Sequence, residues 1–390
     1  MNSQKAATTT RGATSCRASV QYLVVTLVLV AFGCVFACRR GSEPKEDPLN
    51  RDAAGQVHVS AVQGTAKAVI RIGYPGVGIG GRPYIGGNIA AAVHGKRALE
   101  SEFERDGIAI DWSLNKGAGP AVNELIAGRQ LDLAYLGDLA AIIGRSIGLD
   151  TKIVAAGGRG GNLYLVVRHN SSFHSLNDLR GKRVVVFKGT ALQLQAVRIL
   201  EQRGYAESDF KTITMDQATG IAAILGGDVD ALWAQFPILE YVEKGDVRVV
   251  ASSREPAPDK TPSATAFGVL LATGEFERQH ADWVQRVVSV FVKESDWGSE
   301  DKHRDELYNL WSRAGYPKVV FEKDGHDLSR RLSPLLDAQF IGEVKTGADA
   351  ALKFGLIRKA IDVPGWFESK YIEHALKDLK LEQRWFGSRE

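Results

Sequence analysis

From Val69 onward, short runs of β-branched and apolar residues alternate with longer segments of helical periodicity. This alternation predicts an α/β protein built from strand–helix units. Strands are expected at residues 69–73, 108–114, 131–136, 152–156, 163–168, 183–187, 211–214, 231–233, 247–251 and 267–272. Helices are expected near residues 89–103, 120–127, 139–146, 192–202, 221–225 and 237–242.

The strand signals stop after Thr273, and helical patterns such as residues 281–297 fill the rest of the chain. A helical tail of this length is unusual for one doubly wound sheet, but it suits two α/β lobes whose chain returns to the first lobe. The expected domains are therefore residues 67–160 for the first part of lobe 1, 161–252 for lobe 2, and 253–390 for the completion of lobe 1 and the C-terminal helices.

The composition is that of a soluble globular protein, with 44% hydrophobic and 24% charged residues. The formal net charge is only +3, and no basic stripe with interleaved aromatic residues is present. The sequence therefore carries no electrostatic signature of nucleic-acid binding.

The N-terminal segment reads as an export signal. Residues 1–19 are polar and basic, and residues 22–37 ("YLVVTLVLVAFGCVFA") are apolar but slightly short for a membrane span. The stretch Val-Phe-Ala-Cys at 35–38 resembles a bacterial lipobox, with Cys38 as the lipidated residue, whereas Cys34 is a poorer match. The alternative is an uncleaved signal anchor. Either reading places the body of the protein outside the cytoplasmic membrane, in the periplasm or its equivalent.

The chain beyond this signal contains no cysteine, which excludes disulfides and thiol-based metal or nucleophilic sites there. Residues 39–66 are polar, with Pro, Gly and mixed charge, and predict a flexible tether. The signal peptide is accordingly assigned to residues 1–38.

The stretch "GYPGVGIGG" (73–81) contains the Gly76-x-Gly78-x-x-Gly81 spacing of dinucleotide-binding folds. Tyr74 and Pro75 come before Gly76, and Pro83 and further glycines follow the motif, so we expect no helix to settle before about Ile85. The acidic residue expected about 20 positions later is also misplaced. We therefore interpret this loop as a rim, poor in side chains, where backbone can approach a ligand.

Three other turns lie where a predicted strand gives way to a predicted helix: residues 115–120, 137–138 and 188–190. In open α/β sheets, ligands bind beyond the carboxyl ends of the strands, where helix N-termini favour anions. Each turn alone is more simply a capped connection, with Thr190 as a candidate N-cap.

Longer stretches are more specific. "ELIAGRQLDLAYLGD" (124–138), "LNDLRGKRVVVFKGT" (176–190), "GGDVDALWA" (226–234) and "GLIRKAIDVPGWFESKYIEHALKDL" (355–379) resemble the substrate-binding proteins of ABC transporters, in the nitrate/sulfonate/taurine family with the type II periplasmic binding-protein fold. The resemblance implies two α/β lobes that close around a small anion, sulfonate- or taurine-like or nitrate. It also implies delivery of that anion to a membrane permease and its ATPase by a monomeric, lipid-anchored protein.

Carried onto this sequence, the resemblance implies a set of ligand contacts: Tyr74, Gly76, Gly117, Ala118, Gly119, Gly137 and Asp138 from lobe 1, and Gly189, Thr190, Trp233 and Gln235 from lobe 2. Residues 158–162 lie near the expected lobe crossing and are further candidates.

Two of these positions carry open alternatives, and a third departs from the family pattern. Asp138 is either an N-cap or a partner for a substrate ammonium, and Trp233 is either a cover for the ligand body or a core residue. Relatives often carry an aspartate near Gln235, so this chain offers an amide in place of a carboxylate.

No hydrolase elbow, zinc-protease motif or P-loop is present, and no cofactor or metal is implied. The competing readings are an enzyme on the same fold, of the pyrimidine-precursor synthase type, and a ligand sensor that works without an importer. A histidine and cysteine cluster at the cleft would favour the enzyme.

Overall fold

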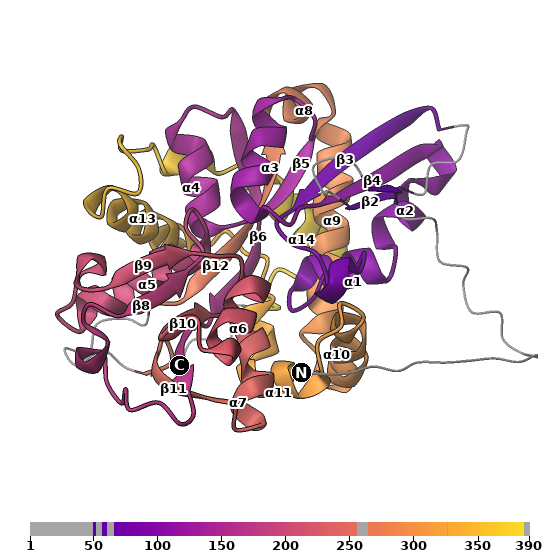
Figure 1. Ribbon diagram of the computed structural model, residues 1–390. Helices are drawn as coiled ribbons and strands as arrows, with labels where there is room; N and C mark the ends of the chain where they lie inside the picture. The colour runs from indigo at the N-terminus through magenta and orange to yellow at the C-terminus, as the bar shows by residue number, and fades with distance from the viewer. Residues whose placement is uncertain (1–49, 52–56, 61–65, 256–263, 326, 386–390) are drawn as a thin grey trace, which may run out of the picture. The chain divides into compact units, whose positions relative to one another are not determined.

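The computed structural model describes residues 50–51, 57–60, 66–255, 264–325 and 327–385. The expected signal peptide, Cys38 and most of the expected tether lie outside these residues. Asp47–Glu390 forms one compact unit that contains two sheets (Figure 1).

The first sheet has seven strands in the order β1-β2-β4-β3-β5-β12-β6. Its central strands β4, β3 and β5 are parallel, whereas β12 runs antiparallel to both β5 and β6. The strands are β1 (Asn50–Arg51), β2 (Val57–Ser60), β3 (Ala68–Tyr74), β4 (Ile108–Leu114), β5 (Leu133–Gly137), β6 (Thr151–Gly161) and β12 (Ala266–Thr273).

The second sheet has five strands in the order β11-β7-β10-β8-β9. Strands β10, β8 and β9 are parallel, and β7 pairs antiparallel with β10 and β11. The strands are β7 (Tyr164–Arg168), β8 (Arg183–Val186), β9 (Lys211–Thr214), β10 (Ala231–Ala234) and β11 (Val247–Ser252). The chain therefore passes from the first sheet to the second between β6 and β7, and returns between β11 and β12.

Helices flank both sheets (Figure 1). The α-helices are α1 (Ile89–Gly95), α2 (Ala98–Phe103), α3 (Ala118–Ala127), α4 (Asp138–Ser146), α5 (Ala191–Gln202), α6 (Gln217–Gly226), α7 (Leu239–Glu243), α8 (Gly274–Gln279), α9 (Ala281–Gly298), α10 (Arg304–Ser312), α11 (Lys318–Asp324), α12 (Leu328–Arg331), α13 (Ala338–Lys353) and α14 (Lys370–Leu379). Short 3₁₀ helices are Ile79–Gly81, Glu104–Asp106, Asn177–Leu179, Glu207–Asp209, η5 (Phe236–Ile238), Asp301–His303 and Pro364–Trp366.

These two mixed sheets with flanking helices confirm the predicted two-lobed α/β fold and its C-terminal helical tail. Every predicted strand exists, because β-branched runs bounded by turn residues are a strong local signal. The structure differs from the expected tether at β2, which pairs antiparallel with β4 and buries Val57 to 1% exposure. This strand has only four residues and lies among polar residues, so the sequence pattern did not predict it.

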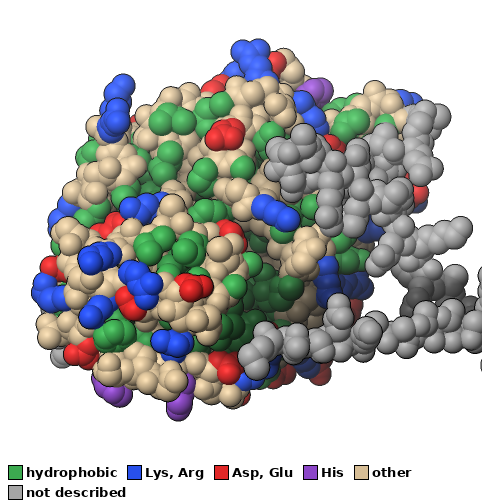
Figure 2. Space-filling model, viewed as in Figure 1, with side chains coloured by type: hydrophobic (Ala, Val, Ile, Leu, Met, Phe, Trp, Pro, Cys, Tyr) green, Lys and Arg blue, Asp and Glu red, His purple; other side chains and the backbone are tan. Residues whose placement is uncertain are grey.

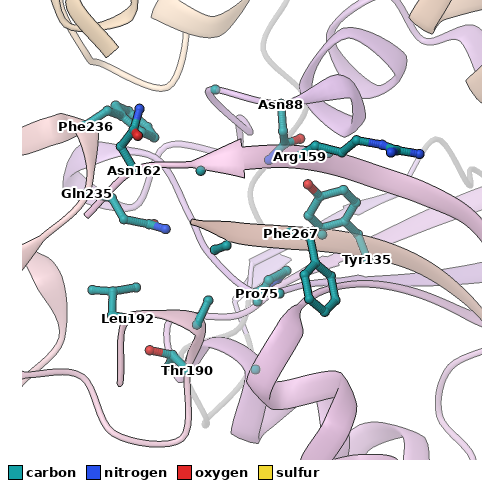
Figure 3. Close-up of a pocket in the computed structure, with 18 of the residues that line it drawn as sticks. Pro75, Asn88, Tyr135, Arg159, Asn162, Thr190, Leu192, Gln235, Phe236 and Phe267 are labelled. Carbon is teal, nitrogen blue, oxygen red and sulfur yellow. The ribbon is translucent and has the colours of Figure 1, made fainter. Parts of the chain in front are cut away.

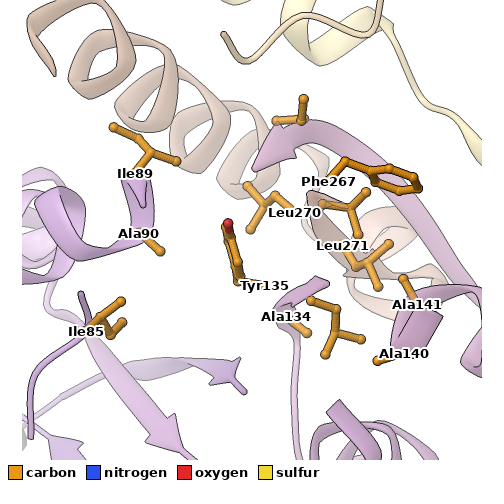
Figure 4. Packing of buried hydrophobic residues seen from close by; sticks show 14 of the residues in the cluster. Ile85, Ile89, Ala90, Ala134, Tyr135, Ala140, Ala141, Phe267, Leu270 and Leu271 are labelled. Carbon is orange, nitrogen blue, oxygen red and sulfur yellow. The ribbon is translucent and has the colours of Figure 1, made fainter. Parts of the chain in front are cut away.

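The core beneath the first sheet continues up to the strand ends (Figure 4). Leu270 and Leu271 of β12 and Ala134 of β5 are buried beside Ala140 and Ala141 of α4. Small alanines on the helix let it lie close to the sheet, which fixes where its N-terminus points. A second core of buried residues, including Leu165, Val184, Leu200 and Trp233, lies in the second lobe.

Charges of both signs are interspersed over the face of the protein shown in Figure 2. With a net charge of only +3, the protein generates little long-range attraction for an anion, so recognition has to be local. Among the described helices, none combines the length and the hydropathy needed to cross a membrane.

Candidate functional site

A cavity of ≈ 200 Å³ is lined by residues that follow strands of both sheets. Tyr74, Gly119 and Gly137 come from the first sheet and its helices, and Thr190 and Gln235 come from the second. Figure 3 shows Thr190 and Leu192 on one side of this space and Gln235 and Asn162 on another. The cavity therefore has one wall of helix starts and another that carries amide side chains.

The helix starts belong to α3 and α5. Gly117 and Thr190 are their N-cap residues, and neither helix has a side-chain hydrogen bond capping its first turn. The Thr190 hydroxyl donates instead to the Phe187 carbonyl, at 2.6 Å. The first N–H groups of a helix have no partner within the helix, and the helix dipole adds positive charge there. Both starts are therefore available to an anion, although at α3 the Ala118 N–H donates to the Asn115 carbonyl at 3.1 Å and Pro120 has no N–H, which leaves the Gly119 N–H.

Glycines bring the two lobes close together at these helix starts. A Cβ atom on Gly189 would lie 3.1 Å from Pro120 of α3, and one on Gly137 would lie 3.2 Å from Ala191 of α5. Gly189 also has a φ of +74°, which other residues rarely adopt. Side chains at these positions would separate the helix starts.

The start of α4 differs from those of α3 and α5 because its first turn contains the carboxylate of Asp138. Asp138 is 1% exposed, and its Oδ1 accepts from the Leu139 N–H at 2.6 Å. Burial raises its pKa to about 7, although hydrogen bonds from the Leu139 and Phe267 backbone act in the opposite direction. Asp138 is the first residue of α4, directly after the N-cap Gly137, and it is not part of the cavity wall. Only its Oδ1 bonds to the helix start, and its Oδ2 has no hydrogen-bond partner among the described residues.

Ala118, the first residue of α3, has a φ of +54° and lines the cavity. A non-glycine residue in the left-handed region stores of order 1–2 kcal/mol of strain. Strain of this kind is concentrated at binding and catalytic sites in proteins. The distorted start of α3 therefore supports a functional role for this wall.

Two tyrosines form the floor near the first sheet. The rings of Tyr74 and Tyr135 lie 5.4 Å apart, and the Tyr74 hydroxyl accepts from Asn88 Nδ2 at 2.6 Å. Tyr135 donates to the Gly157 carbonyl at 3.1 Å. Burial raises the pKa of both phenols well above the ordinary value, so they remain neutral. The Tyr74 hydroxyl proton can then be donated to a ligand.

The glycine-rich loop reaches the cavity only at its ends. Pro75, Gly86 and Gly87 line the cavity, whereas Gly78 and Ile79 contact the turn that follows α10: the Ile79 N–H donates to the Ala314 carbonyl at 2.7 Å. A Cβ atom on Gly78 would lie 2.7 Å from the same carbonyl oxygen. The middle of the loop is thus anchored to the C-terminal helices, and only part of it forms the expected rim.

Trp233 lies in β10 and Gln235 directly follows the end of that strand, but the two side chains lie in different surroundings. Gln235 lines the cavity, and its amide extends into it (Figure 3). Trp233 is 3% exposed and packs in the second core, away from the cavity wall. Of the two alternatives for Trp233, a cover for the ligand or a core residue, its position in the structure is that of a core residue.

A buried ion pair joins the C-terminal segment to the cavity. Asp324 is 3% exposed, and its Oδ2 lies 2.7 Å from Arg331 Nη1. Its Oδ1 accepts from the Tyr164 hydroxyl at 2.9 Å and from Asn162 Nδ2 at 3.3 Å. Arg331 Nη2 lies 3.5 Å from the Gly87 carbonyl. This network connects the crossing between the sheets with the C-terminal segment.

The other arginine of the wall, Arg159, is also engaged. Its side chain is 5% exposed and pairs with Asp337 at 3.2 Å, while Nη2 donates to the Leu335 carbonyl. Its guanidinium lies 4.8 Å from the centre of the Phe340 ring. Both arginines in the described part of the wall therefore already have a carboxylate partner.

Six of the eleven sequence-predicted residues lie in the cavity wall: Tyr74, Ala118, Gly119, Gly137, Thr190 and Gln235. The others lie outside it: Gly76, Gly117, Asp138, Gly189 and Trp233. Gly117 and Gly189 nevertheless precede the two uncapped helices, so they act through the backbone that they position.

Sequence reasoning missed several wall residues, including Asn88, Tyr135, Phe236, Phe267, Asp324 and Arg331. Asn88 had a readable signal, since it precedes an apolar run and caps α1 by accepting from the Ala91 N–H. Asp324 and Arg331 had none, because the return of the C-terminal segment to the crossing is a tertiary event.

Residues 103–296 match the NMT1/THI5-like family. An aliphatic sulfonates-binding protein of Bacillus subtilis (strain 168) is 27% identical over 286 residues, which is 72% of this chain and 82% of that protein. The structure of the periplasmic sulfonate-binding protein SsuA of Methylobacillus flagellatus KT superposes with a TM-score of 0.70 and 27% identity, covering 83% of this chain and 98% of that one.

These matches show the two-lobed periplasmic binding-protein fold that the sequence predicts, which this chain shares with sulfonate-binding proteins. The desulfurization enzyme DSZB shares the fold at 16% identity and a TM-score of 0.57, covering 80% of this chain and 99% of that one. The fold itself therefore serves both binding and catalysis.

Proposed function

We propose that this protein captures a small organic anion, a sulfonate before nitrate, between its two lobes and delivers it to the permease and ATPase of an ABC importer. The observation that carries the proposal is the pair of uncapped helix starts, α3 and α5, which come from different lobes and meet at one cavity. Their N–H groups bind the anionic group, and this shared contact stabilises the closed arrangement of the lobes.

The wall suits an anion that carries an organic body. Leu192, Phe236 and Phe267 provide apolar surface beside the polar groups. A water occupies about 30 Å³ in the liquid, so nitrate would fill only a small part of the ≈ 200 Å³ cavity. A sulfonate with a short chain uses both the helix starts and this surface. The names of the bacterial relatives, which specify sulfonates, point the same way.

The contacts proposed for the anion are the backbone at Gly119, Ala191 and Leu192, with Tyr74 and Gln235 facing the rest of the ligand. Gly76, Asp138 and Trp233 are left out of this set because they lie outside the wall. Gly117, Ala118, Gly137, Gly189 and Thr190 shape the two helix starts.

Isothermal titration of the protein with alkanesulfonates, sulfate, nitrate and carboxylates tests the proposal. We expect saturable one-to-one binding of a sulfonate, with a rise in melting temperature, because a ligand that binds only the folded state stabilises it. Binding of a nucleotide without binding of any small anion would refute the proposal.

We further propose that Cys38 is lipidated and anchors the protein to the outer face of a membrane as a monomer. Cys38→Ser should release the protein from the membrane fraction of the producing cell, whereas the matched variant Cys34→Ser should leave it there. Retention of Cys38→Ser in membranes would favour the uncleaved anchor instead.

A further inference from the structure

The side chain of Gln235 is an uncommitted amide that points into the cavity (Figure 3). Its backbone N–H donates to Gln217 Oε1 at 3.0 Å, but no described residue forms a hydrogen bond with its side-chain amide. Gln235 is also the N-cap residue of η5, and its side chain makes no capping bond there. The amide therefore has no structural partner that explains its position.

The other two amide side chains of the described wall, Asn88 and Asn162, already have hydrogen-bond partners. Asn88 caps α1 through its Oδ1, and its Nδ2 donates to the Tyr74 hydroxyl at 2.6 Å. Asn162 donates to the Asp324 backbone at 3.0 Å and to its carboxylate. Gln235 is therefore the amide of this wall that is left to pair with a ligand.

The charged side chains of the described wall already have partners as well. Asp324 is the one carboxylate among the described wall residues, and it is held by Arg331, Tyr164 and Asn162. Asp138, the other carboxylate near the helix starts, faces the α4 backbone instead of the cavity. A ligand ammonium entering this space would lose its water and find no carboxylate to replace it, which is costly.

We propose that the ligand is a sulfonate whose other end carries an uncharged hydrogen-bonding group, a hydroxyl or carbonyl, and that Gln235 is the residue that selects this group and excludes an ammonium. This inference rests on the proposed function, since it takes the sulfonate to sit at the helix starts. An amide both donates and accepts, so it pairs with a hydroxyl, whereas an alkyl group leaves the amide desolvated and unpaired.

Three sulfonates of equal size test the inference: isethionate (hydroxyl), propane-1-sulfonate (methyl) and taurine (ammonium), each titrated calorimetrically into the protein. The same series with a four-carbon chain (4-hydroxybutane-, pentane- and 4-aminobutane-1-sulfonate) covers the case of a longer ligand, and the better-binding series is used. We expect the hydroxyl compound to bind about tenfold more tightly than the alkyl one and about 100-fold more tightly than the ammonium one.

Variants of Gln235 then separate selection from folding. Gln235→Leu should abolish the preference for hydroxyl over alkyl, and Gln235→Glu should invert the preference for hydroxyl over ammonium. Gln279→Glu is the matched control, because it adds the same charge on the exposed end of α8 and should leave the order of the three ligands unchanged.

The outcomes distinguish the two proposals. Failure of every sulfonate to bind would remove the proposed function. Binding of sulfonates with taurine or its homologue equal to the hydroxyl compound, or a Gln235→Glu variant that keeps the wild-type order, would overturn this inference and leave the proposed function standing.

Discussion

The starts of α4 and α5 lie close to each other and treat negative charge in opposite ways. At α4 the protein supplies the charge itself, because the buried Asp138 carboxylate accepts from the Leu139 N–H. At α5 the N-cap Thr190 turns its hydroxyl to the Phe187 carbonyl and leaves the first turn uncapped at the cavity. A helix start is thus a structural cap or a ligand site according to whether the chain fills it.

The largest expected effect comes from placing a carboxylate at the start of α5, where the chain has none. Thr190→Asp places a carboxylate at the uncapped turn, where it repels a bound sulfonate. We expect a loss of sulfonate affinity of about 100-fold or more, measured by titration calorimetry, because like charges in a site cost several kcal/mol.

Thr190→Asn is the matched control, since Asn caps the same N–H groups without the charge. We expect it to weaken binding by about tenfold, in line with competition for one or two hydrogen bonds. Equal losses for the Asp and Asn variants would mean that charge at α5 is irrelevant to the ligand.

The second effect comes from removing the charge at α4. The pKa of Asp138 is about 7 in the folded protein and 3.8 ordinarily, so the folded state binds the proton more tightly. The contribution of Asp138 to the free energy of unfolding is therefore fully present below about pH 4. It falls as the pH rises toward 7 and is lost above that pH. Asp138→Asn should remove this slope and raise the free energy of unfolding at pH 8 by on the order of 3 kcal/mol.

Asp216 provides a control of opposite sign. It is the N-cap of α6, and although burial tends to raise its pKa, hydrogen bonds from Thr219 and Ala218 together lower it. Asp216→Asn should therefore lose about 0.5–1 kcal/mol at neutral pH, the usual contribution of an exposed charge at a helix start. A shared direction of change for the Asp138 and Asp216 variants, in urea melts at pH 8, would contradict this account of α4.

The smallest effect concerns the strained start of α3. Ala118→Gly relieves the left-handed backbone but adds flexibility to the unfolded chain, and the two contributions oppose each other. We expect a change in unfolding free energy of about 0–1 kcal/mol in the stabilising direction. A loss of more than about 1 kcal/mol in the same urea melts would show that the Ala118 side chain, and not its backbone, is what the fold requires.

The sequence predicted the strands from β3 onward and both helix starts of the cavity because each depends on local patterns: β-branched runs, periodic apolar positions and turn residues. It predicted one helix over residues 89–103, but Arg97, with a φ of +53°, separates α1 from α2 there. It did not predict β2, whose pairing with β4 depends on a distant partner. The Asp324–Arg331 pair and the place of Trp233 in a core were beyond local reasoning for the same reason. Asp138 shows most clearly what local patterns cannot predict, because an aspartate at a helix start has the same sequence pattern whether its side chain faces the helix or a ligand.

A crystal structure of the protein with isethionate tests the central claim most directly. The account predicts that the sulfonate oxygens lie within hydrogen-bonding distance of first-turn N–H groups of both α3 and α5. A sulfonate bound instead at Arg331, or at one lobe alone, would contradict it.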